Sequence, residues 1–370
     1  MLADYVENYN CPSSFKIRHL TGKKISERGH KVTYAYPSNN SRRTTIVDET
    51  DNFRTISTPG VFPKSLRTGG FSVLDIVRKS RLVLSENFDI IHVTCGHRPA
   101  QLIPSLLGKY LKESVIVDEW WEWYGRGGFA GIRKGVIGKL ISCYDVLFEL
   151  PAKSLYDGVI SITSVLKKRL RNNSHVIVLH GGSETGHLID YNIHSSRETL
   201  NLSDDLFIIG MSNLGEDDYE DNRLLFDAFS RLEKDYDNIR LFVTGEKKYL
   251  LKFIETVPYR DKIIYKGWLD FDDYNRYLSA CNIFVLPFRN IPRNSGRWPN
   301  KIGDYLCLNR PVISNPTGDL RVLFEKYNIG FICEETVDAF YQLLRKMLCE
   351  EIDLSKHHAD SRFLATEELD

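Results

Sequence analysis

The second half of the chain alternates short apolar runs with amphipathic stretches, and this alternation restricts the fold more than any other feature. Runs rich in β-branched and aromatic residues occupy residues 205–211, 239–245, 261–267, 282–288, 311–315 and 329–335. Helical patterns lie between several of them, at 221–236, 249–257 and 270–281. Near-continuous apolar strands that alternate with helices are typical of a parallel sheet covered on both faces. We therefore predict a doubly wound α/β domain here.

The first half repeats this pattern less regularly. Strands are predicted at 88–97, 114–121, 157–163 and 174–182. Helices are predicted at 71–86, 98–111, 132–149 and 163–172. A further helix at 14–28 ends in a turn at Gly29, which leads into another strand. A first strand would be expected before that helix, but only "MLADYV" is available for it, so this strand is short or its beginning has been lost.

Length and a polar stretch predict where the domains divide. A chain of 370 residues is long enough for two hydrophobic cores. The stretch 183–205 has little periodicity and separates the two series of strands. We predict an N-terminal Rossmann-like domain at 1–185, a C-terminal Rossmann-like domain at 186–345, and a tail at 346–370.

Charge and cysteine content exclude several classes of protein. The 49 basic and 49 acidic residues balance, so no global field attracts nucleic acid. The seven cysteines include no Cys-x-x-Cys pair, which argues against a zinc site and a disulfide framework. No apolar run approaches the ~18 residues of a membrane span, and the N-terminus is polar. We expect a cytoplasmic protein, at most peripheral at the inner face of a membrane.

The loop after the run at 282–288 is locally cationic. It carries three arginines: Arg289, Arg293 and Arg297. Pro299 stands where a helix prefers to begin, and Lys301 and Asp304 follow three residues apart. The carboxyl end of a parallel strand and a helix N-terminus together favour a bound anion. The alternative is an exposed Lys301–Asp304 pair with solvated arginines.

With two doubly wound domains and this loop, the chain resembles the retaining nucleotide-sugar-dependent glycosyltransferases of the GT-B fold (group 1, family-4-like). The segments that carry the resemblance are 25–33, 88–93, 157–170, 265–288 and 301–320. It implies two Rossmann-like domains facing a central cleft, with the donor in the second and the acceptor in the first. It also implies that Asp304 takes the ribose hydroxyls and that Gly267, Trp268 and Leu269 meet the base.

The chain departs from the family pattern at two places. Gly296 stands where family members often carry a second acid. The loop after 205–211, where the family usually places an arginine and a lysine, holds Ser212, Asn213 and an acidic run at 216–221. We interpret the acidic run as a solvated loop. We therefore hypothesise that Arg297 and Lys301 bind the diphosphate, assisted by Arg289 or Arg293.

The stretch 115–128 is the strongest signal in the first half. Asp118 and Glu119 end a buried strand and are candidates to orient the acceptor hydroxyl or to act as its base. Aromatic and glycine residues follow as a candidate acceptor platform: Trp120, Trp121, Trp123, Gly127 and Gly128. Each tryptophan fits an ordinary packing role equally well. His97 follows the strand at 88–97 and is a further catalytic candidate, with a structural role as the alternative.

Metal and membrane signals are weak. The Asp-x-Asp in "DFDD" opens a helix, so Asp270 or Asp272 is expected to cap it. We predict no metal ion and no cofactor beyond the donor sugar nucleotide. The basic and apolar stretch 131–144 fits either a packed helix or contact with anionic lipid.

The sequence therefore predicts a metal-independent glycosyltransferase of the hexosyltransferase type. Its donor is a nucleoside diphosphate sugar, and its acceptor is a hydroxyl of a glycan, a lipid-linked sugar or a small molecule, as in polysaccharide or glycolipid biosynthesis. A nucleotide-sugar epimerase or hydrolase of the same fold and a catalytically silent binding module remain open. A dehydrogenase ranks last, because no Gly-x-Gly-x-x-Gly follows any strand.

Overall fold

The computed structural model describes residues 1–2, 17–37, 44–58, 70–172, 174–182, 185–186, 188–215 and 219–369. These residues form two compact units. Unit 1 contains the described residues up to His180 together with Ser295–Trp298. Unit 2 contains the described residues from Gly181 to Asn294 and from Pro299 onward.

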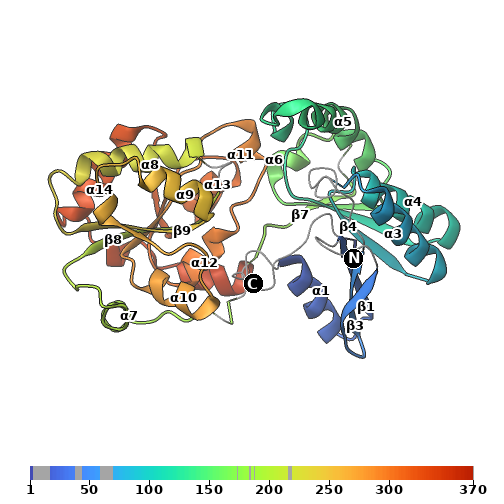
Figure 1. Cartoon of the computed structure of the whole chain (residues 1–370), viewed down its shortest axis with the longest axis horizontal. Helices are drawn as coiled ribbons and strands as arrows, with labels where there is room; N and C mark the ends of the chain where they lie inside the picture. The colour runs from blue at the N-terminus through green and yellow to red at the C-terminus, as the bar shows by residue number, and fades with distance from the viewer. Residues whose placement is uncertain are drawn as a thin grey trace. The chain divides into compact units, whose positions relative to one another are not determined.

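Unit 2 is built on a six-stranded sheet (Figure 1). Its strands are β8 (Phe207–Leu214), β9 (Ile239–Gly245), β10 (Ile263–Tyr265), β11 (Ile283–Leu286), β12 (Val312–Ser314) and β13 (Gly330–Ile332). They pair in the order β10-β9-β8-β11-β12-β13, and every pair is parallel. This is the strand order of a doubly wound dinucleotide-binding sheet, and it confirms the predicted fold of this half.

The helices of unit 2 precede, connect and follow these strands. They are α7 (Ile193–Leu200), α8 (Tyr219–Leu232), α9 (Lys247–Ile254), α10 (Phe271–Ser279), α11 (Pro292–Ser295), α12 (Lys301–Cys307), α13 (Asp319–Lys326), α14 (Val337–Leu348) and α15 (Ser361–Phe363). Asp270 caps α10, accepting the Asp273 N–H at 2.9 Å, as predicted. The helix after the arginine loop begins at Lys301 instead of Pro299, and the short helix α11 before it was not predicted.

Unit 1 has two groups of strands. One is β1 (Val32–Pro37), β2 (Thr45–Glu49) and β3 (Phe53–Thr58), and the other is β4 (Ile90–Thr94), β5 (Val115–Trp120), β6 (Gly158–Ser161) and β7 (Val176–Val178). Leu2 forms bridges to both Ala35 of β1 and Val93 of β4, so it joins the two groups. The expected first strand is thus represented by a bridge at Leu2, and the rest of "MLADYV" lies outside the described residues.

The helices of unit 1 follow the predicted pattern, with two corrections. They are α1 (Ile17–Glu27), α3 (Val73–Ser85), α4 (Pro99–Lys112), α5 (Gly135–Lys153) and α6 (Ser164–Lys167). Helices α3 and α4 lie side by side (Figure 1). Helix α6 has four residues instead of the ten expected, while α5 runs four residues beyond the predicted end at 149. Gly29 has a φ of 93°, as the predicted turn requires.

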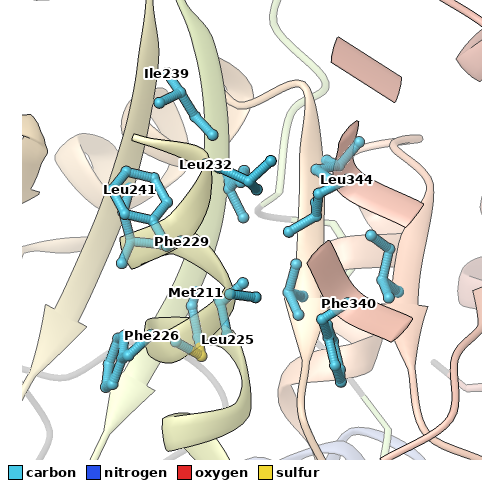
Figure 2. Packing of buried hydrophobic residues seen from close by; sticks show 14 of the residues in the cluster. Met211, Leu225, Phe226, Phe229, Leu232, Ile239, Leu241, Phe340 and Leu344 are labelled. Atoms are coloured by element: carbon cyan, nitrogen blue, oxygen red, sulfur yellow. The ribbon is translucent and has the colours of Figure 1, made fainter. Parts of the chain in front are cut away.

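The core of unit 2 explains how α14, near the end of the chain, is held. Figure 2 shows side chains of α8 and α14 pointing toward one another beside β8 and β9. Phe229 of α8 and Phe340 and Leu344 of α14 have no exposed surface. Protein interiors are closely packed and leave few voids, so each fully buried ring contributes to the stability of unit 2.

Truncating this core should destabilise unit 2. We expect Phe340→Ala to lower the free energy of unfolding by about 3–5 kcal/mol, because it removes a buried ring and leaves a cavity. Phe363→Ala is the matched control, since that ring is 54% exposed. Urea unfolding followed by circular dichroism measures both changes, and equal losses in the two variants would contradict the assigned core.

Candidate active site

Strands β8 and β11 are neighbours in the sheet of unit 2, although the chain leaves them in opposite directions. Helix α8 follows β8 toward β9, whereas the arginine loop and α12 follow β11 toward β12. Open α/β sheets bind ligands at the carboxyl ends of strands where the chain changes direction in this way, and we call this place the β8–β11 crevice. Most of the predicted donor-binding residues of unit 2 lie around this point.

A buried polar network closes the end of β8. The Ser212 N–H donates to the hydroxyl of Tyr305 at 2.8 Å. The hydroxyl of Tyr274 lies 2.9 Å from Asp304 Oδ2 and 3.1 Å from Ser212 Oγ. Burial, with Asp304 beside it, raises the pKa of Tyr274 well above its usual value, so this phenol stays protonated and donates to the carboxylate.

Lys301 and Asp304 both face this network. The ammonium group of Lys301 donates to the carbonyl oxygen of Ser212 at 3.0 Å. Asp304 has no exposed surface. The alternative of an exposed Lys301–Asp304 pair is therefore wrong, because each side chain contacts the β8 end or its network. No sequence pattern pointed to Tyr274 and Tyr305, since tyrosines in a helix also pack as plain core residues.

The prediction that the acidic run after β8 is a solvated loop is wrong for Asp221. Asp221, in the first turn of α8, is 1% exposed. Its carboxylate accepts the Arg289 Nε–H at 2.7 Å and the Asn294 amide at 2.9 Å, and Arg293 Nη2 lies 3.5 Å away. The interpretation of this acid as solvated is wrong, because it neutralises part of the arginine loop. Residues 216–218 of the acidic run lie outside the described residues.

The remaining donor candidates of unit 2 follow β8 and β10. Gly267 has a φ of 63°, and its carbonyl accepts the Gly245 N–H at 3.0 Å, which holds the loop after β10 against the end of β9. Trp268 is 46% exposed and Leu269 half-buried on that loop. Asn213 lies in β8, but its side chain is outside the described part of the structure. Arg297 groups with unit 1.

The candidates of unit 1 converge on helix α5. His97 follows β4 and is fully buried, with its Nε2 3.0 Å from Asp145 Oδ1 of α5. Arg98 donates to the other oxygen of Asp145 at 2.7 Å, and Arg133 pairs with the same oxygen. Burial, aided by the positive charge of Arg98, lowers the pKa of His97, so its imidazole is neutral near neutral pH.

Both carboxylates at the end of β5 have partners within unit 1. Asp118 is fully buried, pairs with Lys153 of α5 and accepts the Gly96 N–H at 2.8 Å. It therefore holds the turn that carries His97, and each of its oxygens has a partner. Glu119 lies 3.5 Å from His92 Nε2. Burial opposes ionisation of Glu119, but His92 and Arg18 outweigh it and lower its pKa, so the carboxylate is charged.

Glu149 of α5 holds the loop that follows β5. It accepts the backbone N–H groups of Tyr124 and Gly125 at 2.7 and 3.0 Å, and the indole N–H of Trp120 at 3.2 Å. Arg169 completes its ion pair at 2.8 Å. Trp120 has no exposed surface, so it is a core residue and not part of an accessible platform. Trp121 and Trp123 are half-buried on the same loop.

The glycines of this loop have a structural requirement. Gly127 has a φ of 90°, in the left-handed region. A Cβ on Gly128 would lie 1.8 Å from the carbonyl oxygen of Trp123. Both positions thus need glycine for the path of the chain, and contact with an acceptor stays a prediction.

The spacing of charged residues in the sequence could have predicted the buried face of α5. Asp145, Glu149 and Lys153 recur every four residues, and Lys139 is the only other charged residue of this helix. That spacing places them on one face of the helix. Charges on a single face of an apolar helix indicate buried ion pairs, because an unpaired buried charge costs several kcal/mol.

The described residues show neither a metal centre nor a membrane-spanning helix. They contain no cluster of three or more histidine, cysteine or acidic side chains arranged to hold a metal ion. Among the same residues, no helix combines the length and the apolar character that crossing a bilayer requires.

A family model matches the part of the chain that contains this site. Residues 206–350, the strands and helices around the β8–β11 crevice, match the model for group 1 glycosyl transferases. This region is a group 1 glycosyltransferase domain. The chain matches no curated protein by sequence.

Solved structures extend the likeness in fold beyond residues 206–350 to the whole chain. A sucrose-phosphate synthase from Thermosynechococcus elongatus has a TM-score of 0.77 at 12% identity, over 100% of this chain and 94% of its own. HepE from Anabaena, solved with UDP and glucose, has a TM-score of 0.71 at 11% identity, over 100% and 95%. WaaG, a glycosyltransferase of lipopolysaccharide biosynthesis, has a TM-score of 0.65 at 13% identity, over 100% and 96%. These likenesses establish the GT-B fold.

Loss of the buried Asp118–Lys153 ion pair is expected to destabilise unit 1. Lys153→Met should lower the free energy of unfolding by about 3–5 kcal/mol, because it leaves a buried carboxylate without its counter-charge. Asp118→Asn combined with Lys153→Met should recover part of that loss, since no uncompensated charge remains. Chemical unfolding of the single and double variants measures the coupling, and strictly additive losses would contradict a direct ion pair.

Burial of neutral His97 leads to a prediction about how stability depends on pH. The unfolded chain has a histidine pKa of about 6.5, above that of buried His97, so the unfolded state binds more protons below that pH. Stability contributed by neutral His97 is therefore lost as the pH falls through about 6.5. His97→Gln should depend less steeply on pH than the wild type in unfolding experiments. His194→Gln, at a side chain 67% exposed, is the control. Parallel curves for wild type and His97→Gln would reject the assignment.

Proposed function

We propose that this glycosyltransferase moves a hexosyl group from a nucleoside diphosphate sugar to a hydroxyl group of a glycan, a lipid-linked sugar or a small acceptor. The bond from the anomeric carbon to the diphosphate breaks, and a bond to the acceptor oxygen forms on the same face of the sugar. The acceptor proton leaves with a base or with the departing phosphate. The observation that carries the proposal is the buried polar network at the β8–β11 crevice, within the group 1 domain.

The donor is assigned to unit 2. Asp304, oriented by Tyr274, is the proposed partner of the ribose hydroxyls. The loop at Gly267–Leu269 is proposed to meet the base, which the exposed part of Trp268 supports. The HepE complex with UDP-glucose supports a nucleoside diphosphate sugar as the class of donor.

The diphosphate is assigned to the cations around the same crevice. Lys301 lies against the β8 end, and Arg289 and Arg293 share the single charge of Asp221. Among the described residues, these three cations outnumber the two buried acids, Asp221 and Asp304, by one. Positive charge preorganised at this point favours both binding and departure of the diphosphate. A contact from Arg297 stays part of the hypothesis.

The acceptor is assigned to unit 1. Glu119, ionised at the end of β5, is the better candidate for the base, because Asp118 is committed to Lys153 and Gly96. His97 is neutral and lies beside the same strand ends. Trp121 and the loop containing Gly127 and Gly128 are proposed to contact the acceptor. We also propose a cytoplasmic location, peripheral contact with a membrane and no requirement for a metal ion.

Calorimetry on the arginine loop tests the donor site. Arg289→Ala should weaken binding of a nucleoside diphosphate about 10- to 100-fold, because a charge-assisted hydrogen bond contributes about 1.5–3 kcal/mol. Binding of the corresponding nucleoside should not change. Arg223→Ala is the control, because that arginine lies on α8 with a side chain 55% exposed. Unchanged diphosphate affinity in Arg289→Ala would reject this part of the site.

A further inference from the structure

Helix α5 is built with its charged side inward. Asp145, Glu149 and Lys153 are at most 1% exposed and belong to the ion pairs described above. On the other side, Val136, Leu140 and Leu147 are 77%, 66% and 59% exposed. At 100° per residue these three fall within about 40° of one another around the helix, opposite Asp145. An ordinary surface helix has the reverse arrangement.

The exposed stripe is wide. Further apolar side chains border it on both sides: Ile137 at 40%, Val146 at 48% and Phe148 at 44% exposed. Cys143, on the same side, is also exposed. A contiguous exposed apolar surface of this kind marks a site that another surface covers. We call the side chains of residues 136, 137, 140, 146, 147 and 148 the outer face of α5.

The exposed charges of the segment that carries the outer face are of one sign. Between residues 126 and 156 the only acids are Asp145 and Glu149, and both are buried in ion pairs. The exposed charges of this segment are cations: Arg126, Lys134 and Lys139. The chain as a whole has a net charge of zero, so this is a local bias. An apolar stripe flanked by lysine and arginine matches the headgroup region of an anionic bilayer.

We propose that the outer face of α5 lies in the surface of a lipid bilayer containing anionic lipids. The inner face of the same helix holds the loop after β5, through the bonds from Glu149 to the backbone of Tyr124 and Gly125. Docking would therefore bring the proposed acceptor loop to the membrane surface. This inference deepens the membrane contact in the proposed function, but it depends on α5 alone and not on the donor site. The competing occupant is the α5 of a second copy of the chain.

Co-sedimentation with vesicles tests the docking. We expect the wild-type chain to sediment with vesicles of phosphatidylcholine and phosphatidylglycerol, and less with phosphatidylcholine alone or at high salt. Leu140→Glu should lower the affinity for anionic vesicles by about tenfold or more, because it puts a charge in the apolar stripe. Leu111→Glu is the matched control, because Leu111 lies on α4 of the same unit and is 63% exposed.

Each outcome separates the alternatives. Loss of binding in Leu140→Glu with binding kept in Leu111→Glu supports the docking. A wild type that stays in the supernatant, or equal losses in the two variants, overturns it. A wild-type dimer in light scattering that Leu140→Glu dissociates, without vesicle binding, assigns the face to a second copy instead. Thermal stabilisation by nucleoside diphosphates, measured in the same variants, reports on the proposed donor site independently.

Discussion

Ion pairs buried beneath helix α5 determine how unit 1 arranges the carboxyl edge of its sheet. Asp145, Glu149 and Lys153 each hold a different part of that edge: the turn after β4, the loop after β5, and Asp118 at the end of β5. Removing one partner from such a pair is costly, because the remaining charge is left in a medium of low polarity. The three pairs therefore connect β4, β5 and α5 to one another.

The same pairs explain the unusual exterior of α5. Positions four residues apart share one face of a helix, and here charged side chains occupy that face. Val136, Leu140 and Leu147 of the same helix point outward, where contact with water is unfavourable for apolar side chains. The need to pair charges inside unit 1 thus leaves an apolar outer face on α5. This links the fold of unit 1 to the lipid surface that we propose it contacts.

Unit 2 applies the same rule at the crevice between β8 and β11. Asp221 and Asp304 are buried, and each is compensated: Asp221 by arginines of the neighbouring loop, Asp304 by the Tyr274 hydroxyl. Because two arginines share Asp221, positive charge remains at the edge where an anionic donor is proposed to bind. The chain achieves this with residues different from the arginine and lysine expected after the first strand of the group 1 domain.

The sequence by itself determined the two α/β halves, most strands, the Asp270 cap and the group 1 glycosyltransferase character, because these depend on periodicity and local spacing. Tertiary structure alone decided the state of each charged or aromatic side chain. Asp221 stands in a run of acids that the sequence predicts to be solvated, yet it is buried. Trp120 belongs to the predicted acceptor platform, yet it is buried as well. Their partners, Arg289 and Glu149, lie far away in the sequence. Burial and ion pairing depend on such distant contacts, which local patterns do not encode.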